Sequence, residues 1–245
     1  MALAEDIAEA CEEIITVNEG RASFYRMLSS LFYREVTQEK IGELLAINWN
    51  GLYADDNAEG GEDLLEGLRL MTGSLMRADG RTRQALASDY AHTFLAAGTY
   101  KESRAVPYES VYTSEDGLLM QDARDDVYRL FCQEHLGTDD SEHEPEDHIS
   151  FECEFMATMA DRLNGALRQR DWSEAVRLAS VAFVFHSTHL ANWIDDFAAA
   201  IEACAQTDFY RGLSKVAQAF IKDDATSLTD ISTSVNAMAR ACGVE

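Results

Sequence analysis

The side chains best suited to chemistry stand in an acidic stretch with one proline at residues 143–156. Asp147 and His148 are adjacent there, and a carboxylate beside an imidazole is common in general acid–base catalysis. Side chains of neighbouring helical residues diverge by about 100°, so these two do not readily form one hydrogen-bonded pair. Both can instead line the rim of a groove. Alternatively, Asp147 caps backbone N–H groups and His148 makes a local polar contact.

The same stretch predicts a helix whose first turn is exposed. Pro145 suits the first helical position, and Glu146 and Asp147 complement the positive end of the helix dipole. Apolar residues then recur at spacings of three and four, as on one buried helical face: Ile149, Cys153, Met156, Leu163 and Leu167. We therefore expect a polar edge at the helix start, set on a buried base.

A second candidate site is the segment 106–112, which contains Pro107, Tyr108 and Tyr112. Proline and two tyrosines can simply anchor a loop on the core. They can also form a platform for a ligand, with aromatic faces for apolar groups and hydroxyls for polar ones. His189 and Trp193, one turn apart, lie beside the most apolar helix and are expected in the core.

Catalytic and metal-binding motifs are absent from the sequence. It has no nucleophile elbow, no phosphate-binding loop and no H-E-x-x-H pair. Six histidines among many carboxylates leave a helical metal-dependent enzyme as the alternative function, but no Glu-x-x-His pair of a ferritin-like site occurs. Asp89 with His92, and His186 with His189, have the right spacing without a matching second pair. We expect no catalytic residue, no metal site and no cofactor.

The composition restricts the partners of the chain. The formal net charge is −24, from 44 acidic and 20 basic residues. Phosphate backbones and anionic membrane surfaces repel such a chain, so we expect no nucleic-acid partner and no membrane insertion. The longest uncharged run, residues 178–194, is too short and polar to span a bilayer. The cysteines are well separated, which is typical of reduced core residues. The first residues are acidic, unlike those of a signal peptide, so we expect a cytoplasmic location.

Helical periodicity covers most of the chain, and no strand alternation of useful length occurs. The clearest helices are expected at residues 4–33, 38–47, 61–77 and 81–95, with Gly20 as a candidate break in the first. Another is expected to begin at a capping box, residues 113–116, and Asp171 with Glu174 begins a nearly all-apolar, central helix. Loops are expected at 48–61, 96–111 and 137–144, the second being the functional loop. The prediction is an all-α chain forming one domain over residues 1–245.

Three short motifs also occur in order along the chain. They are a Tyr-x-x-x-Phe helix end at Tyr90 to Phe94, a Pro-aromatic-x-Ser-Val-Tyr loop at 107–112, and Glu-Pro-x-Asp-His-Ile at 144–149. His189-Leu190-x-x-Trp193 and Phe209-Tyr210 follow. Together they resemble the TorD/DmsD family of redox-enzyme maturation chaperones, which is related to NarJ. The resemblance extends over about residues 20–222.

This resemblance implies a single-domain array of about ten to twelve helices, either a monomer or a homodimer. It implies a cytoplasmic chaperone that binds the twin-arginine signal peptide and the apo form of a molybdenum-cofactor oxidoreductase, similar to the DMSO and TMAO reductases. Such a chaperone delays export until the cofactor is inserted. Some members bind guanine nucleotide, but this sequence has no phosphate loop. The implied peptide-binding residues are Tyr90, Phe94, Pro107, Tyr108, Asp147 and His148, with Glu144 and Glu146 as further acidic contacts.

A signal peptide with two arginines needs carboxylates, and each charge-assisted hydrogen bond contributes about 1.5–3 kcal/mol. The acidic run available for this purpose is Asp139, Asp140, Glu142, Glu144, Glu146 and Asp147. Phe94, Pro107 and Tyr108 are expected to line an apolar groove for the hydrophobic part of the peptide. The chain departs from the family at Thr93, where leucine is common, at Ala-Ala-Gly after Phe94, and in lacking the second proline and the tryptophan of the loop. These departures concern the identity of the client and the depth of the groove.

Overall fold

A computed structural model describes residues 2–47, 49, 61–77, 81–95, 104–137 and 144–244. Within these ranges the chain forms ten α-helices and one short π-helix. The only β-type pairing in the described ranges is an isolated antiparallel bridge between Tyr108 and His148. The expected all-α class, with about ten to twelve helices, is therefore confirmed.

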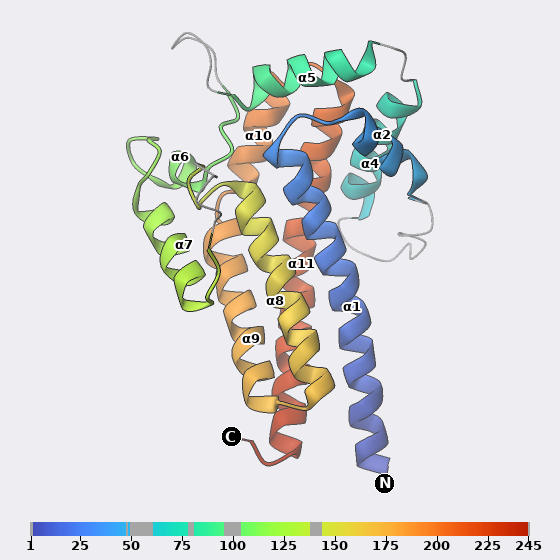
Figure 1. Ribbon diagram of the computed structural model, residues 1–245, viewed down its shortest axis with the longest axis vertical. Helices are drawn as coiled ribbons and strands as arrows, with labels where there is room; N and C mark the ends of the chain where they lie inside the picture. The colour runs from blue at the N-terminus through green and yellow to red at the C-terminus, as the bar shows by residue number, and fades with distance from the viewer. Residues whose placement is uncertain are drawn as a thin grey trace.

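Four long helices run side by side and form a bundle (Figure 1). They are α1 (Ala2–Tyr33), α8 (Ile149–Gln169), α9 (Trp172–Phe185) and α11 (Asp208–Ala241). Helix α1 packs against α8, α8 against α9, and α9 against α11. The π-helix η1 (His186–Leu190) and α10 (Ile194–Cys204) connect α9 to α11. None of the described helices is long and apolar enough to cross a membrane.

The shorter helices cover one end and two opposite sides of this bundle (Figure 1). Helix α5 (Thr82–Thr93) lies across its upper end, α2 (Gln38–Ala46) lies beside α1, and α4 (Gly61–Met76) packs against α11. Helices α6 (Glu109–Thr113) and α7 (Asp122–Gln133) lie on the opposite side. The end that carries α5 and α6 is also the end at which α8 begins.

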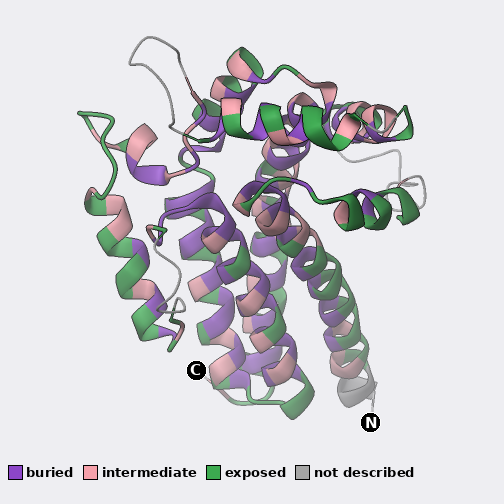
Figure 2. Ribbon diagram, turned by 45° about the horizontal axis from the view of Figure 1, so that its top comes forward, coloured by how far each residue is buried: buried purple, intermediate pink, exposed green. Residues whose placement is uncertain are grey.

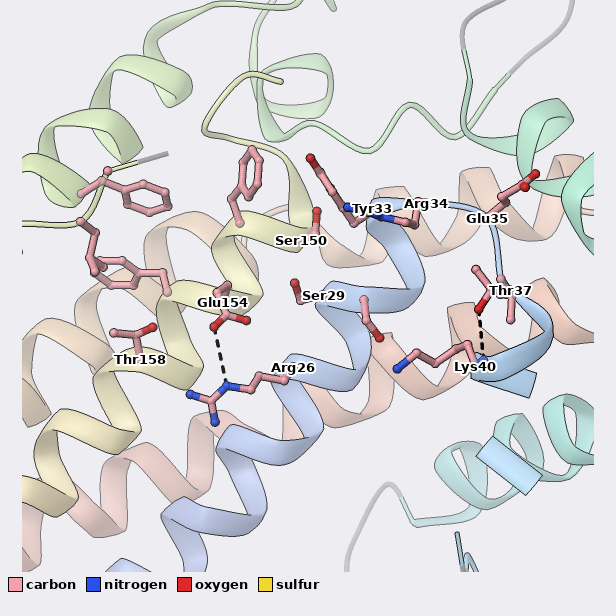
Figure 3. A pocket seen from close by; sticks show the side chains of 17 residues that line it. Arg26, Ser29, Tyr33, Arg34, Glu35, Thr37, Lys40, Ser150, Glu154 and Thr158 are labelled. Atoms are coloured by element: carbon pink, nitrogen blue, oxygen red, sulfur yellow. Dashed lines mark hydrogen bonds and ion pairs between the residues drawn. The ribbon is translucent and has the colours of Figure 1, made fainter. Parts of the chain in front are cut away.

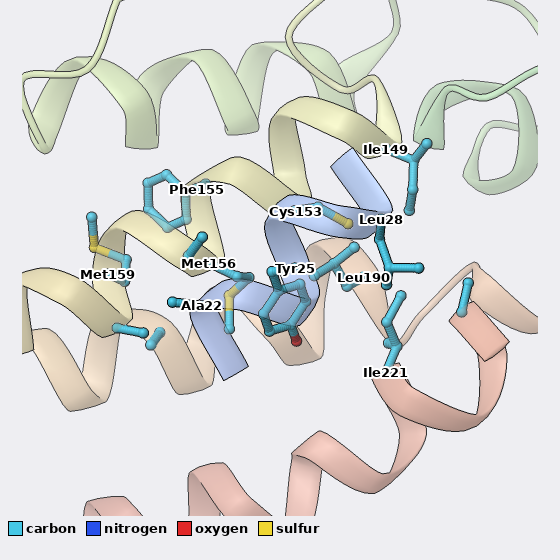
Figure 4. Close-up of a cluster of buried hydrophobic side chains, with 14 of the residues drawn as sticks. Ala22, Tyr25, Leu28, Ile149, Cys153, Phe155, Met156, Met159, Leu190 and Ile221 are labelled. Atoms are coloured by element: carbon cyan, nitrogen blue, oxygen red, sulfur yellow. The ribbon is translucent and has the colours of Figure 1, made fainter. Parts of the chain in front are cut away.

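The apolar stripe predicted for α8 is confirmed, because all five of its residues named above are buried. Tyr25 and Leu28 of α1 meet Cys153 and Met156 of α8 in this core (Figure 4). Figure 2 shows buried residues along the facing sides of the bundle helices. Helix α9 differs from its expected central position, because Phe183 is 41% exposed, whereas the next-but-one residue, Phe185, is fully buried.

A buried polar network fixes α1 to the bundle. Asp224 of α11 accepts hydrogen bonds from Arg21 Nε at 2.5 Å and from the Tyr25 hydroxyl at 2.7 Å. Asn18 donates to Asn164 of α8 at 3.0 Å. Because buried polar groups are costly when unpaired, these bonds favour one register of α1 against its neighbours.

Two expected boundaries are wrong. Helix α1 continues through Gly20, where no break occurs. The capping-box residues 113–116 end α6 instead of beginning the next helix, and α7 begins only at Asp122. The intervening turn contains Gly117 at φ 62° and Met120 at φ 60°, left-handed conformations that a continuous α-helix excludes. Most of the loops expected at 48–61, 96–111 and 137–144 lies outside the described residues.

Candidate functional site

The structure pairs the two segments that the sequence singled out. Glu109 donates its backbone N–H to the carbonyl of Asp147 at 2.9 Å, and Ile149 donates to the carbonyl of Pro107 at 3.0 Å. These bonds flank the bridge between Tyr108 and His148. The proline–tyrosine segment therefore lies directly on the start of α8.

The expected exposure of Asp147 and His148 is wrong, because they are only 0% and 3% exposed. Helix α8 begins at Ile149, with His148 as its N-cap, so Pro145 lies in the preceding turn and not in the first helical position. Residues 107–109, which pair with this turn, cover it. Glu146 is also buried, and Arg124 of α7 donates to its carboxylate at 2.5 Å.

His148 makes the local polar contact that was one of the two interpretations of this residue. Its Nδ1 accepts the backbone N–H of Ser150 at 3.1 Å, which satisfies one free donor of the helix start. Burial lowers the pKa of His148 to about 3. His148 is consequently neutral near pH 7, and it is not hydrogen-bonded to Asp147 among the described contacts.

Asp147 caps backbone N–H groups, as the second interpretation held, but it does so in another helix. Its Oδ2 accepts the backbone N–H of Ser110 at 2.9 Å and the Ser110 hydroxyl at 2.5 Å. Ser110 lies in the first turn of α6. Burial raises the pKa of Asp147, and the hydrogen bonds from Ser110 oppose that rise.

Tyr108 and Glu144 form the surface of this arrangement. The Tyr108 ring packs edge-on against His148, with centroids 4.9 Å apart, and its hydroxyl donates to the carboxylate of Glu144. Tyr108 is half-buried and Glu144 is exposed. Burial, followed by the hydrogen bond to Glu144, raises the pKa of Tyr108, so its hydroxyl stays protonated and acts as a donor.

Tyr90 and Phe94 lie beneath the surface. The Tyr90 hydroxyl donates to the carbonyl of Phe32 at 2.9 Å, and the Phe94 ring packs against Tyr210 at 5.4 Å. Phe94 and Pro107 are buried, so the apolar groove expected from Phe94, Pro107 and Tyr108 does not form from these residues. The end of α5 is joined to the segment that carries Tyr108, because Ala105 donates its backbone N–H to the carbonyl of Thr93 at 3.0 Å.

A cavity of about 630 Å³ opens beside this surface, between the end of α1, the start of α2 and the first turns of α8 (Figure 3). Its aromatic lining comes from Tyr33, Phe131, Phe151 and Phe155. The Tyr33 ring lies 6.2 Å from His148 and 5.7 Å from Phe151, measured between centroids. Tyr33 thus connects the cavity to Tyr108 through His148.

The rim of the cavity carries charges of both signs, and several are already paired. Arg26 lies 3.6 Å from Glu154, as Figure 3 shows, and it also binds Asp161. Glu35 lies 3.4 Å from Arg83. The apolar floor is therefore bordered by exchangeable ion pairs.

These cavity residues are not evident from the sequence pattern. Tyr33 and Phe155 are spaced like ordinary core positions of long helices. Phe151 could have been identified from the sequence, because it lies off the apolar stripe predicted for α8. In the structure its side chain is half-buried. A large aromatic side chain in that position indicates a surface that can bind a ligand.

The candidate metal ligands do not converge. Asp89 caps the start of α11 by accepting the N–H groups of Gln206 and Thr207 at 3.0 and 2.7 Å. His186 bonds to the carbonyl of Ile221, and His189 to Glu109. Within the described part of the chain, no three His, Cys, Asp or Glu side chains are placed to hold a metal ion.

Comparison with known proteins places this arrangement in a family. Residues 54–199 match the family model of the nitrate reductase delta subunit. The chaperone protein TorD of Photobacterium profundum is 30% identical over 221 residues, which cover 89% of this chain and 98% of TorD. TorD of Vibrio cholerae serotype O1 is 30% identical over 225 residues, which cover 90% and 97% of the two chains.

The fold is shared with a solved structure, a protein described as a redox enzyme maturation protein from Archaeoglobus fulgidus. The TM-score is 0.50 at 20% sequence identity, and the match covers 82% of this chain and 93% of that one. The helical fold and these relatives define the class of the protein, which is a chaperone and not an enzyme. The chain belongs to the nitrate reductase delta subunit family and is of the TorD type.

Proposed function

We propose that the chain is a cytoplasmic chaperone that binds the twin-arginine signal peptide and the apo form of a molybdenum-cofactor oxidoreductase. It delays export of this client until the cofactor is inserted, and residues 1–245 act as one domain. The observation that supports this best is the aromatic cavity beside Tyr108 and Glu144, in a chain related along most of its length to TorD.

The two parts of the site suit the two parts of such a peptide. Glu144 is exposed, and its hydrogen-bond partner within the described part of the chain is Tyr108, so its carboxylate can accept a guanidinium of the peptide. Glu35 and Glu154 are further acceptors at the cavity rim. Each forms a surface ion pair with an arginine of the chain, and an arginine of the peptide can replace that partner. The hydrophobic part of the peptide binds over Tyr33, Phe151 and Phe155, as in recognition of an apolar helix by a groove.

The remaining site residues act from beneath. Tyr90, Phe94 and Pro107 support the segment that presents Tyr108, while Asp147 and His148 cap α6 and α8. Glu146 contacts the peptide only where an arginine of the peptide displaces Arg124. Of the residues predicted for the site, Tyr108 and Glu144 therefore contact the peptide, and the others hold these two in place.

Titration calorimetry with signal peptides of molybdoenzymes encoded near this protein tests the proposal. Because the client must later be released, a dissociation constant on the order of micromolar is expected, or about 8 kcal/mol. Tyr108→Ala and Phe151→Ala should each weaken binding about tenfold or more. Phe183→Ala, which removes an exposed aromatic side chain from α9 outside the site, is the matched control. A correctly folded wild-type protein that binds none of these peptides contradicts the proposal.

A further inference from the structure

Three buried carboxyl groups meet beneath Tyr108. Glu109 and Asp147 pair through their backbones, and Glu152 lies one turn into α8. All three residues are at most 2% exposed. Among the described residues no lysine or arginine forms an ion pair with any of them. Buried carboxylates without cations are costly, so this cluster needs another means of limiting its charge.

Glu109 is the acceptor at the centre of the cluster. Its Oε2 accepts a hydrogen bond from Nδ1 of His189 at 2.9 Å, and its Oε1 accepts one from the side-chain amide of Asn192 at 2.8 Å. His189 lies in η1, the π-helix that interrupts the path from α9 to α10. Such π-helical turns reorient side chains and are frequent at functional sites.

Glu152 is placed to be a donor. Its Oε2 accepts the indole N–H of Trp193 at 3.2 Å, whereas its buried Oε1 has no donor partner. The carboxyl group beside it is Glu109, whose two oxygens already accept bonds from His189 and Asn192. A proton on Glu152 would satisfy both side chains through one hydrogen bond. Burial, followed by the nearby charges of Glu109 and Asp147, raises the pKa of Glu152 well above its ordinary value.

We propose that Glu109, Glu152 and His189 are positioning residues for the peptide site, in which Glu152 is a neutral carboxylic acid that donates a hydrogen bond to Glu109. Glu109 directly follows Tyr108, so anchoring Glu109 fixes the backbone that presents the Tyr108 ring. The groups that face Glu152 are Glu109 from α6, Asp147 from the turn before α8, His189 from η1, and Trp193, the N-cap of α10. Glu109 and His189 also line a separate cavity of about 400 Å³ beside α7, so this side of the cluster borders a cavity.

The two neighbouring glutamates should respond oppositely to the same isosteric change. Glu152→Gln replaces the O–H donor by an N–H donor and keeps the carbonyl for Trp193, so the arrangement is preserved. Glu109→Gln leaves a single carbonyl oxygen for the donors of His189, Asn192 and Glu152 and turns an amide N–H toward at least one of them, so the arrangement is broken. Glu202→Gln on the exposed face of α10 is the matched control.

Infrared spectroscopy tests the protonation directly and needs no peptide. At neutral pH the wild type and Glu202→Gln should show the carbonyl band of a buried protonated carboxyl group, and Glu152→Gln should lose it. Absence of the band from the folded wild type, or its persistence in Glu152→Gln, overturns the inference. Because this result is independent of any client, it decides the inference even if the proposed signal-peptide binding fails.

Peptide affinity tests the positioning role, which rests on the proposed function. Glu109→Gln should weaken binding about tenfold or more, and Glu152→Gln should stay near the wild type. A group whose pKa is raised by folding loses its contribution as the pH rises through that pKa. Wild-type affinity should therefore decline on the alkaline side, and Glu152→Gln should remove this decline. Equal losses in both glutamine variants, or identical pH profiles, contradict the positioning role.

Discussion

The role of an acidic residue is decided by its neighbours as much as by its charge, and Asp147 illustrates this. In the sequence, Asp147 stands in an acidic run and suggests a surface for arginines. In the structure it is buried and holds the first turn of α6 through Ser110. In the proposed function, Asp147 therefore acts on peptide binding by holding the segment that carries Tyr108.

Replacement of Asp147 should accordingly affect stability as well as binding. Asp147→Ala leaves the Ser110 N–H without an acceptor, which costs about 1–3 kcal/mol of unfolding free energy. Asp147→Asn keeps one acceptor oxygen and should lose less. Urea unfolding measures both, with exposed Asp230→Ala expected within about 0.5 kcal/mol of the wild type. An unchanged unfolding midpoint in Asp147→Ala would show that the cap is not needed.

His148 predicts a pH dependence of the opposite sign to that of Glu152. Its pKa falls from 6.5 to about 3 on folding, so the stability it contributes is present above about pH 6.5 and is lost as the pH falls toward 3. The loss approaches about 1.4 kcal/mol per pH unit. Asn at position 148 keeps an N-cap acceptor for Ser150 and does not titrate, so His148→Asn should flatten this acid limb.

Denaturant unfolding between pH 7 and pH 5 measures this difference. The control is His135→Asn, because His135 is exposed and its φ of 54° is one that asparagine tolerates. The same acid limb in His148→Asn as in the wild type would refute the assignment.

At the scale of helices, several boundaries that depend on nearby residues are predictable from the sequence, whereas a boundary that depends on a distant segment is not. The helices expected at 38–47 and 61–77 are α2 and α4 to within a residue, and the start at Asp171 with Glu174 is confirmed by their hydrogen bond. These boundaries depend on nearby residues. The start of α6 depends instead on Asp147, 37 residues further along the chain, and no local pattern encodes that contact.

The crossing of α4 and α11 gives a sharp test of packing. A Cβ added at Gly67 would lie 2.7 Å from the backbone carbonyl of Gly212, and one added at Gly212 would lie 2.5 Å from that of Gly67. Neither backbone can move without separating the helices. Gly67→Ala and Gly212→Ala should each therefore destabilise the protein by about 1–3 kcal/mol, measured by thermal or urea unfolding.

Gly165 in α8 is the matched control, because a Cβ there meets nothing within 4 Å. Gly165→Ala should stabilise the protein by about 0.5–1 kcal/mol, since alanine favours the helix more than glycine does. Destabilisation at all three positions would show that helix propensity and close approach do not explain these glycines.

At the scale of the whole molecule, the motifs indicate the candidate site but not the cavity beside it. The segments around Tyr108 and His148 were identified from sequence and are paired in the fold. The cavity instead forms where α1, α2 and α8 meet, and residues such as Tyr33 and Phe151 become neighbours only through that packing. Periodicity describes one helix at a time, so it cannot indicate which faces of separate helices enclose a space.

The net charge of −24 adds a long-range attraction to this site, which leads to a prediction about salt. The Debye length falls from about 10 Å at 0.1 M to about 3 Å at 1 M ionic strength. Raising the salt over this range should lower the affinity for a peptide with two arginines, mainly by slowing association. Calorimetry and stopped-flow fluorescence at both ionic strengths measure the two effects.

The control is the same peptide with both arginines replaced by glutamine, which retains the hydrophobic part that binds over Tyr33 and Phe151. Its weaker binding should depend little on salt, because apolar burial is not screened. Equal salt dependence of the two peptides would mean that the acidic surface does not recognise the arginines. Binding would then depend on the aromatic cavity alone.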